Sequence, residues 1–261
     1  MPGRPSAASR ARRLTLARAR RAVYHHAHVR RSTPSAAPES RVIIRKVGIR
    51  KRRQSIVTRV LLVRHGRTPT TGSVLPGRAP GLHLSEDGKK EAAATAERIA
   101  ALKSVAAVYA SPLERARETA DIIAARRGLV VLTEPGLLEC DIGDWTGWEI
   151  AKAAKTPEWA TVQRYPSGFR FPGGESFVEI QTRMTTTIAA LVARHPGETV
   201  VAVSHADPIK TAVAHALGTP LDLFQRIMIA TASISAIAYG RGGPAVLTVN
   251  FTGGELANLV G

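Results

Sequence analysis

Arginine and histidine side chains follow three separate apolar segments of this 261-residue sequence. Arg64 and His65 come directly after the first segment, and Arg115 lies a few residues beyond the end of the second. His205 follows a third such segment. Guanidinium and imidazole N–H groups donate hydrogen bonds to the oxygens of a dianion such as phosphate. These residue types indicate a phosphate site, provided that the fold brings the three segments together.

The apolar segments are short and alternate with longer segments that carry helix-start and helix-stop signals, such as Ser85, Gly128 and Gly218. We expect strands at 60–63, 106–110, 130–132, 199–203, 233–239 and 246–250. We expect helices at 85–103, 113–127, 176–195 and 207–217, with a loop-rich stretch at 134–174. The pattern predicts a three-layer α/β/α fold with a mostly parallel sheet and one or more antiparallel strands.

The carboxyl ends of parallel strands share one edge of the sheet, and ligands bind at that edge. We therefore expect Arg64, His65, Arg115 and His205 to line one crevice, together with the amide groups of helix N-termini. Each of these residues taken alone is more often structural. Four cationic or near-cationic groups at one edge would repel one another without an anion, so the set as a whole favours a functional interpretation.

The positive charge of the chain is concentrated at its N-terminus. Residues 1–55 hold 16 Lys and Arg against one acid, Glu39, for a net charge of +15. Residues 56–261 hold 21 Lys and Arg against 19 Asp and Glu, for a net charge of +2. We therefore predict a catalytic domain over 56–261 behind a basic extension over 1–55, and the overall charge says little about the domain.

The extension lacks a regular apolar period, so we expect it to be disordered or at most a fraying helix. Three interpretations remain open. The first is an arm that binds nucleic acid or an anionic surface, and the second is a transit peptide. The third is upstream sequence translated from a wrongly chosen start, which is favoured because the domain begins abruptly with a strand. Any contact with nucleic acid would then be made through this segment alone.

The rest of the composition excludes other classes. No apolar run approaches the length of a membrane span. The single cysteine, Cys140, excludes an internal disulfide and fits a reducing compartment, so we expect a cytoplasmic protein. The oligomeric state is left open.

Five ordered motifs give the sequence a family resemblance over roughly residues 58–251. They are VLLVRHGRT at 60–68, SPLERARETA at 111–120, LECDIGDWTG at 138–147, FPGGES at 171–176 and VSH at 203–205. In this order and spacing they resemble the histidine phosphatase superfamily, the clan of phosphoglycerate mutase-like proteins. The segment SHADPIK at 204–210 is similar to a bacterial branch of phosphomutases and phosphatases.

The resemblance implies a role for each motif residue. His65 is the nucleophile and carries the phosphoryl group as phosphohistidine. Arg64, Arg115 and His205 hold the phosphoryl oxygens. Glu139 protonates the leaving alcohol and then activates water. Asp207 is the rival proton donor, ranked second because Ala206 separates it from the histidine.

Further substrate contacts are expected from Arg67, Thr68, Arg78, Arg115, His205 and Ala206. Thr71 stands where the family commonly has an asparagine that faces the substrate. Cys140 is expected to be a small buried residue without reactivity.

The resemblance implies a metal-independent phosphomonoester hydrolase that needs no cofactor and acts on a small phosphorylated substrate. A phosphomutase is the first alternative, disfavoured because the sequence lacks the longer tyrosine- and lysine-bearing segment of phosphoglycerate mutases. A non-catalytic phosphate-binding or nucleic-acid-associated protein that uses the basic tail is the second. The second alternative is disfavoured because a protein that only binds phosphate needs neither a nucleophile such as His65 nor a proton donor such as Glu139.

Overall fold

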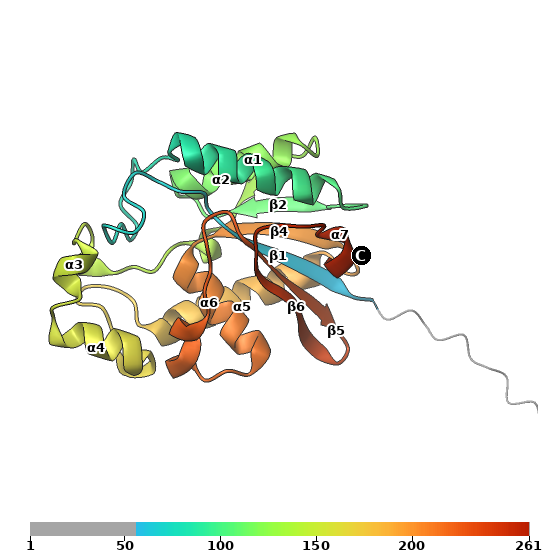
Figure 1. Ribbon diagram of the computed structural model, residues 1–261. Helices are drawn as coiled ribbons and strands as arrows, with labels where there is room; N and C mark the ends of the chain where they lie inside the picture. The colour runs from blue at the N-terminus through green and yellow to red at the C-terminus, as the bar shows by residue number, and fades with distance from the viewer. Residues whose placement is uncertain (1–55, 261) are drawn as a thin grey trace, which may run out of the picture. The chain divides into compact units, whose positions relative to one another are not determined.

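The structure, a computed structural model, describes residues 56–260. The predictions for the basic extension 1–55 lie outside these described residues. In the described part, a sheet of six strands lies between two layers of helices (Figure 1). Among residues 56–260 no helix is long and apolar enough to cross a bilayer.

The strands are β1 (Thr58–Arg64), β2 (Ala107–Ala110), β3 (Val131–Thr133), β4 (Thr199–Ser204), β5 (Ile234–Gly240) and β6 (Gly243–Phe251). Their order across the sheet is β3-β2-β4-β1-β5-β6. The four strands β3, β2, β4 and β1 are parallel, whereas β5 runs antiparallel to both β1 and β6. The predicted fold class, a mostly parallel sheet with antiparallel strands, is confirmed.

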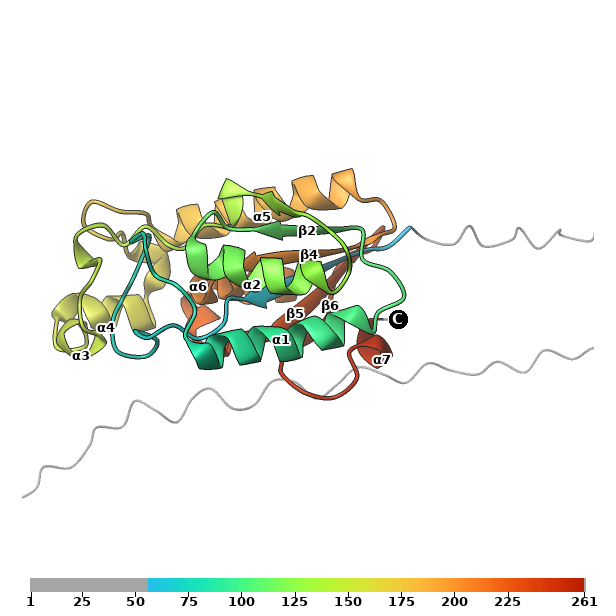
Figure 2. The same cartoon turned by 90° about the horizontal axis from the view of Figure 1, so that it is seen from above.

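The longer helices are α1 (Glu86–Ala100), α2 (Glu114–Ala125), α5 (Phe177–Arg194) and α6 (Ala206–Leu217). Helices α1 and α2 cover one face of the sheet, and α5 and α6 cover the other (Figure 2). The alternation of side chains along β1 sorts its residues between the faces. Leu61 and Val63 pack beneath α1 and α2, whereas Val60 and Leu62 pack against α5 and α6, and all four are fully buried.

The expectation of a loop-rich stretch over 134–174 is wrong in part. It contains two short helices, α3 (Ile150–Ala153) and α4 (Pro157–Arg164). Thr156 caps α4 by accepting a hydrogen bond from the Trp159 amide, and Pro157 stands in its first turn. A third short helix, α7 (Ala257–Val260), follows β6 and is also absent from the sequence-based expectation.

Aromatic packing holds α3 and α4 at one end of the sheet (Figure 1). Trp145 is buried at the centre of this cluster and stacks on Trp148 at a centroid distance of 5.4 Å. The other aromatic members are Trp159, Phe169, Phe171, Phe177 and Phe224. The Trp148 carbonyl accepts a hydrogen bond from the Leu75 amide, so the cluster is also tied to the loop that follows β1.

Candidate active site

The parallel pairing of β1 with β4 brings the two histidines together. Arg64 pairs with Ser204 in the register of these strands, so the next residue of each strand, His65 and His205, leaves the sheet at the same edge. The His65 amide donates to the Ser204 carbonyl at 3.0 Å. The two imidazole rings are 5.2 Å apart between centroids and are tilted by 59°. The two histidines expected at the strand ends thus lie side by side.

Two glycines allow α1 to pack against the loop that carries His65. A Cβ atom at Gly66 would overlap the Gly88 carbonyl oxygen, and one at Gly88 would overlap the Arg67 carbonyl oxygen, so neither position has room for a side chain. The Gly66 amide also donates to Oγ1 of Thr119, which fixes the loop against α2. Thr119 belongs to the SPLERARETA motif, but a threonine within a helix gives no signal of this contact.

His65 is buried and is held in the tautomer that a nucleophile needs. Its Nδ1 lies 2.7 Å from the Gly66 carbonyl oxygen, which can only accept a hydrogen bond, so Nδ1 carries the proton. The lone pair is therefore on Nε2. Burial, with Arg115 and Arg64 nearby, lowers the pKa of His65 to about 3. The ring is neutral at every pH near neutrality, with Nε2 available for attack.

The two arginines present buried donors at the site. Arg115 has no solvent exposure; its Nη2 donates to the Gly77 carbonyl at 2.8 Å, while Nε and Nη1 have no partner among the described residues. Arg64 donates from Nη1 to the Ile229 carbonyl, and its Nε has no partner within residues 56–260. Burial lowers the pKa of both groups, although guanidinium stays charged in proteins. Unsatisfied buried donors are costly, so these N–H groups point to an anionic ligand.

His205 adds a second neutral imidazole. Its Nε2 lies 2.8 Å from Oγ of Ser111, at the end of β2, and its Nδ1 has no hydrogen-bond partner in the described part of the chain. Burial and the neighbouring Arg115 hold the pKa of His205 well below its ordinary value. When the Ser111 hydroxyl donates to Nε2, Nδ1 keeps its proton and becomes a donor to the site.

Glu139 lies beside His205 and has a raised pKa. Its Oε1 accepts a hydrogen bond from the Cys140 amide, and its Oε2 is 3.8 Å from Nδ1 of His205. Burial, with a contribution from the negative charge of Asp207, raises the pKa of Glu139 to about 7, although Arg115 and Arg64 oppose the shift. The group can therefore both give and take a proton near neutral pH.

Two neighbours of Glu139 differ in their surroundings. The Asp207 carboxylate, in the first turn of α6, accepts a hydrogen bond from Nζ of Lys210 at 3.1 Å. Cys140 is buried, as expected, and burial raises the pKa of its thiol; its lack of reactivity stays a prediction. The choice between Glu139 and Asp207 as donor stays a prediction.

The further substrate contacts expected from the sequence occupy different positions. Ala206 is the first residue of α6, next to His205. Thr68 is buried and bonds to Thr71: its amide donates to Oγ1 of Thr71 at 2.9 Å, and the two hydroxyls are 3.0 Å apart. Thr71, found in place of the family's asparagine, therefore shapes the loop that holds Thr68.

Arg67 and Arg78 are both engaged by acidic residues of the protein. Arg67 is half exposed, with Nε 3.6 Å from Glu91 of α1. Arg78 forms an ion pair with Glu175 at 2.9 Å and donates from Nε to the Glu139 carbonyl at 2.8 Å. Direct contact of either arginine with a substrate stays a prediction.

Comparison with known proteins agrees with this geometry. Residues 60–252 match the family model of the histidine phosphatase superfamily (branch 1). This chain belongs to that superfamily, as its motifs predicted.

Relatives of known name include phosphatases. Phosphoserine phosphatase 1 of Hydrogenobacter thermophilus is 30% identical over 209 residues, which cover 75% of this chain and 93% of that protein. A protein of Mycobacterium tuberculosis is 38% identical over 168 residues, 59% of this chain and 76% of the relative. Among solved structures, a mycobacterial glucosyl-3-phosphoglycerate phosphatase superposes with a TM-score of 0.68 at 28% identity, covering 75% of this chain and 99% of that one.

Proposed function

We propose that this protein is a phosphomonoester hydrolase that forms a phosphohistidine at Nε2 of His65. The observation that carries the proposal is the set of buried donors of Arg64 and Arg115, unpartnered among the described residues, beside a histidine whose Nδ1 is already committed to a carbonyl. These donors suit the non-bridging oxygens of a phosphoryl group, where the transition state carries its charge. The phosphatases among the relatives support hydrolysis as the reaction.

In the first step, Nε2 of His65 attacks phosphorus while the bond to the ester oxygen breaks. The leaving oxygen takes the proton of Glu139 and departs as an alcohol. The products on the enzyme are a phosphohistidine and the Glu139 carboxylate. Arg64, Arg115 and His205 hold the three non-bridging oxygens throughout.

In the second step, the Glu139 carboxylate takes a proton from water as the water oxygen attacks phosphorus. The N–P bond breaks, inorganic phosphate leaves, and both His65 and Glu139 return to their starting forms. A pKa of Glu139 of about 7 serves both steps, because the group must be an acid in the first and a base in the second.

The test is release of inorganic phosphate by the full chain from a panel of phosphomonoesters. Phosphoserine and glucosyl-3-phosphoglycerate belong in the panel because relatives are named for them. We expect turnover of at least one ester, and none with His65→Ala. A product that keeps its phosphate on a different hydroxyl would identify a phosphomutase instead, and binding without turnover would identify the non-catalytic alternative.

We also propose that the enzyme works in the cytoplasm and meets nucleic acid or anionic surfaces only through residues 1–55. The single cysteine supports a reducing compartment. The near-neutral charge of residues 56–261 supports confining such contacts to the basic segment.

A further inference from the structure

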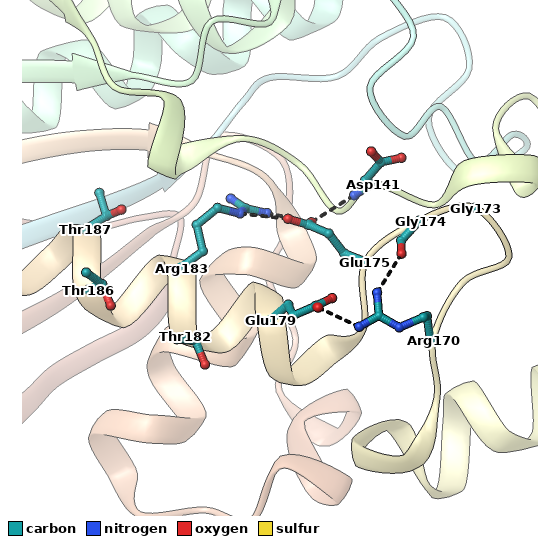
Figure 3. Close-up of a pocket in the computed structure, with 10 residues that line it drawn as sticks. All are labelled: Asp141, Arg170, Gly173, Gly174, Glu175, Glu179, Thr182, Arg183, Thr186 and Thr187. Atoms are coloured by element: carbon teal, nitrogen blue, oxygen red, sulfur yellow. Dashed lines mark hydrogen bonds and ion pairs between the residues drawn. The ribbon is translucent and has the colours of Figure 1, made fainter.

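A groove runs along the first turns of α5, beside the loop that precedes this helix (Figure 3). Two arginine–glutamate pairs line it. Arg170 pairs with Glu179 and donates to the Gly174 carbonyl. Arg183 pairs with Glu175 at 2.9 Å. The pairs look alike in composition, but only the second contacts the segment that carries Glu139.

Arg183 binds three carbonyl groups of that segment. Its Nη1 donates to Gly136 at 2.9 Å and to Leu138 at 2.8 Å, and its Nη2 donates to Glu139 at 3.3 Å. A planar guanidinium that binds successive carbonyls fixes the path of the main chain between them. The contact therefore sets where the Glu139 backbone lies.

Glu175 joins this contact to a second arginine. Its carboxylate accepts from Nε of Arg183 at 3.1 Å, pairs with Nη2 of Arg78 at 2.9 Å, and accepts from the Asp141 amide at 3.1 Å. Arg78 donates in turn from Nε to the Glu139 carbonyl. The main chain is thus held on both sides of Glu139, and its own carbonyl receives two guanidiniums.

The Glu139 side chain depends on this support. Its Oε1 is bound to the amide of the very next residue, and its Oε2 is too far from Nδ1 of His205 for a hydrogen bond. The main chain therefore determines where the carboxyl group lies. A proton donor must come within about 3 Å of the leaving oxygen, and a misplacement of about 1 Å can cost on the order of 100-fold in rate.

We propose that Arg183, together with Glu175 and Arg78, positions Glu139 for proton transfer in the hydrolysis proposed above. These are positioning residues, since none of their hydrogen bonds or ion pairs reaches the histidines; the charge of Arg183 acts on His205 only at a distance, where it helps to lower the pKa of that ring. The inference rests on the proposed function and assigns a role to Glu175 of the FPGGES motif. It also gives Arg78 a task other than the direct substrate contact expected from the sequence.

A cluster that only stabilised the fold would affect all substrates alike. A positioning cluster affects the step in which Glu139 gives its proton. Esters with a poor leaving group, such as alkyl phosphates, need that proton, whereas nitrophenyl phosphate hardly needs it. A larger loss of kcat/KM on the alkyl phosphate than on nitrophenyl phosphate therefore distinguishes a positioning role from a purely structural one.

The experiment compares Arg183→Met with Arg170→Met, a matched control from the same groove. Both changes remove an arginine that pairs with a glutamate; Arg170 donates to one main-chain carbonyl, that of Gly174, whereas Arg183 donates to three. For Arg183→Met we expect kcat/KM on an alkyl phosphate to fall on the order of 10- to 100-fold, with a much smaller fall on nitrophenyl phosphate. Arg170→Met should change neither. Glu175→Gln keeps the size of the side chain and should also lower kcat/KM on the alkyl phosphate more than on nitrophenyl phosphate. This second variant tests the proposal if Arg183→Met does not fold.

An equal fall on both esters, or no fall, in a folded Arg183→Met or Glu175→Gln protein would overturn the positioning role while wild-type hydrolysis stands. A wild-type chain that hydrolyses neither ester nor any member of the panel would overturn the proposed function, and this role with it.

Discussion

Nδ1 of His205 and Oε2 of Glu139 face each other across 3.8 Å inside the site. Burial keeps His205 neutral and raises the pKa of Glu139, so the two do not form an ion pair at neutral pH. The gap is wider than a hydrogen bond, yet one oxygen atom can lie within hydrogen-bond distance of both atoms. In the mechanism proposed above, His205 holds a non-bridging oxygen and Glu139 protonates the leaving oxygen, so both atoms would face the phosphoryl group.

The proton donor is tested by Glu139→Gln. On an alkyl phosphate we expect the variant to lose about 100-fold or more in kcat/KM, the order of general acid catalysis, with a small effect on nitrophenyl phosphate. Steady-state kinetics with the two esters measures the difference. Asp207→Asn is the matched control, and the assignments must be exchanged if it shows this pattern and Glu139→Gln does not.

The pH dependence of the alkyl ester follows from the pKa of Glu139. The group must be protonated in the first step, so kcat/KM should fall about tenfold per pH unit above a pKa of about 7. The groups that face Glu139 are Asp207, Arg115, Arg64 and His205. Asp207→Asn removes the negative charge among them and should move the falling limb to lower pH. The assignment of this fall to Glu139 would be contradicted if kcat/KM still fell at high pH in Glu139→Gln, or if the fall moved to higher pH in Asp207→Asn.

Removal of metal ions should leave activity intact. Arg64 and Arg115 supply positive charge where a metal would otherwise bind the phosphoryl oxygens. Within residues 56–260 no three His, Cys, Asp or Glu side chains are grouped so as to hold a metal. We expect unchanged turnover after dialysis against excess EDTA. Loss of turnover that Mg²⁺ or Zn²⁺ restores would show that the two guanidiniums are insufficient.

Deletion of residues 1–55 should leave turnover on a small ester essentially unchanged. All residues of the proposed site lie from Arg64 onward, and the remaining chain carries +2 instead of +17. Long-range attraction for anions weakens, but salt already screens it beyond about 8 Å at physiological ionic strength. Binding to nucleic acid or anionic vesicles, if the full chain shows any, should disappear. A large fall in turnover, or an insoluble product, would move the domain boundary toward the N-terminus.

Much of the site could be predicted because its residues follow strands directly. Arg64, His65 and His205 stand at the ends of β1 and β4, where chain direction alone places them at one edge. The order of the strands could not be predicted in this way, since β4, which comes later in the chain, lies between β1 and β2. Contacts between distant segments decide that order.

The positioning cluster could not be predicted for a related reason. Glu175 and Arg183 are separated from Arg78 by about a hundred residues, and an arginine on a helix surface usually faces solvent. The short helices α3 and α4 were missed because their stability comes from the aromatic cluster beneath them and not from their own length.

The central claim is that His65 carries the phosphoryl group, and trapping that intermediate tests it most directly. The full chain is mixed with a radiolabelled ester, quenched without acid, and digested to locate the label. We predict label on His65, stable to base and released by acid, and none in His65→Ala. With nitrophenyl phosphate, Glu139→Gln should accumulate label, because it forms the intermediate but lacks the base that hydrolyses it. Label on a serine or an aspartate, or undiminished label in His65→Ala, would contradict the account.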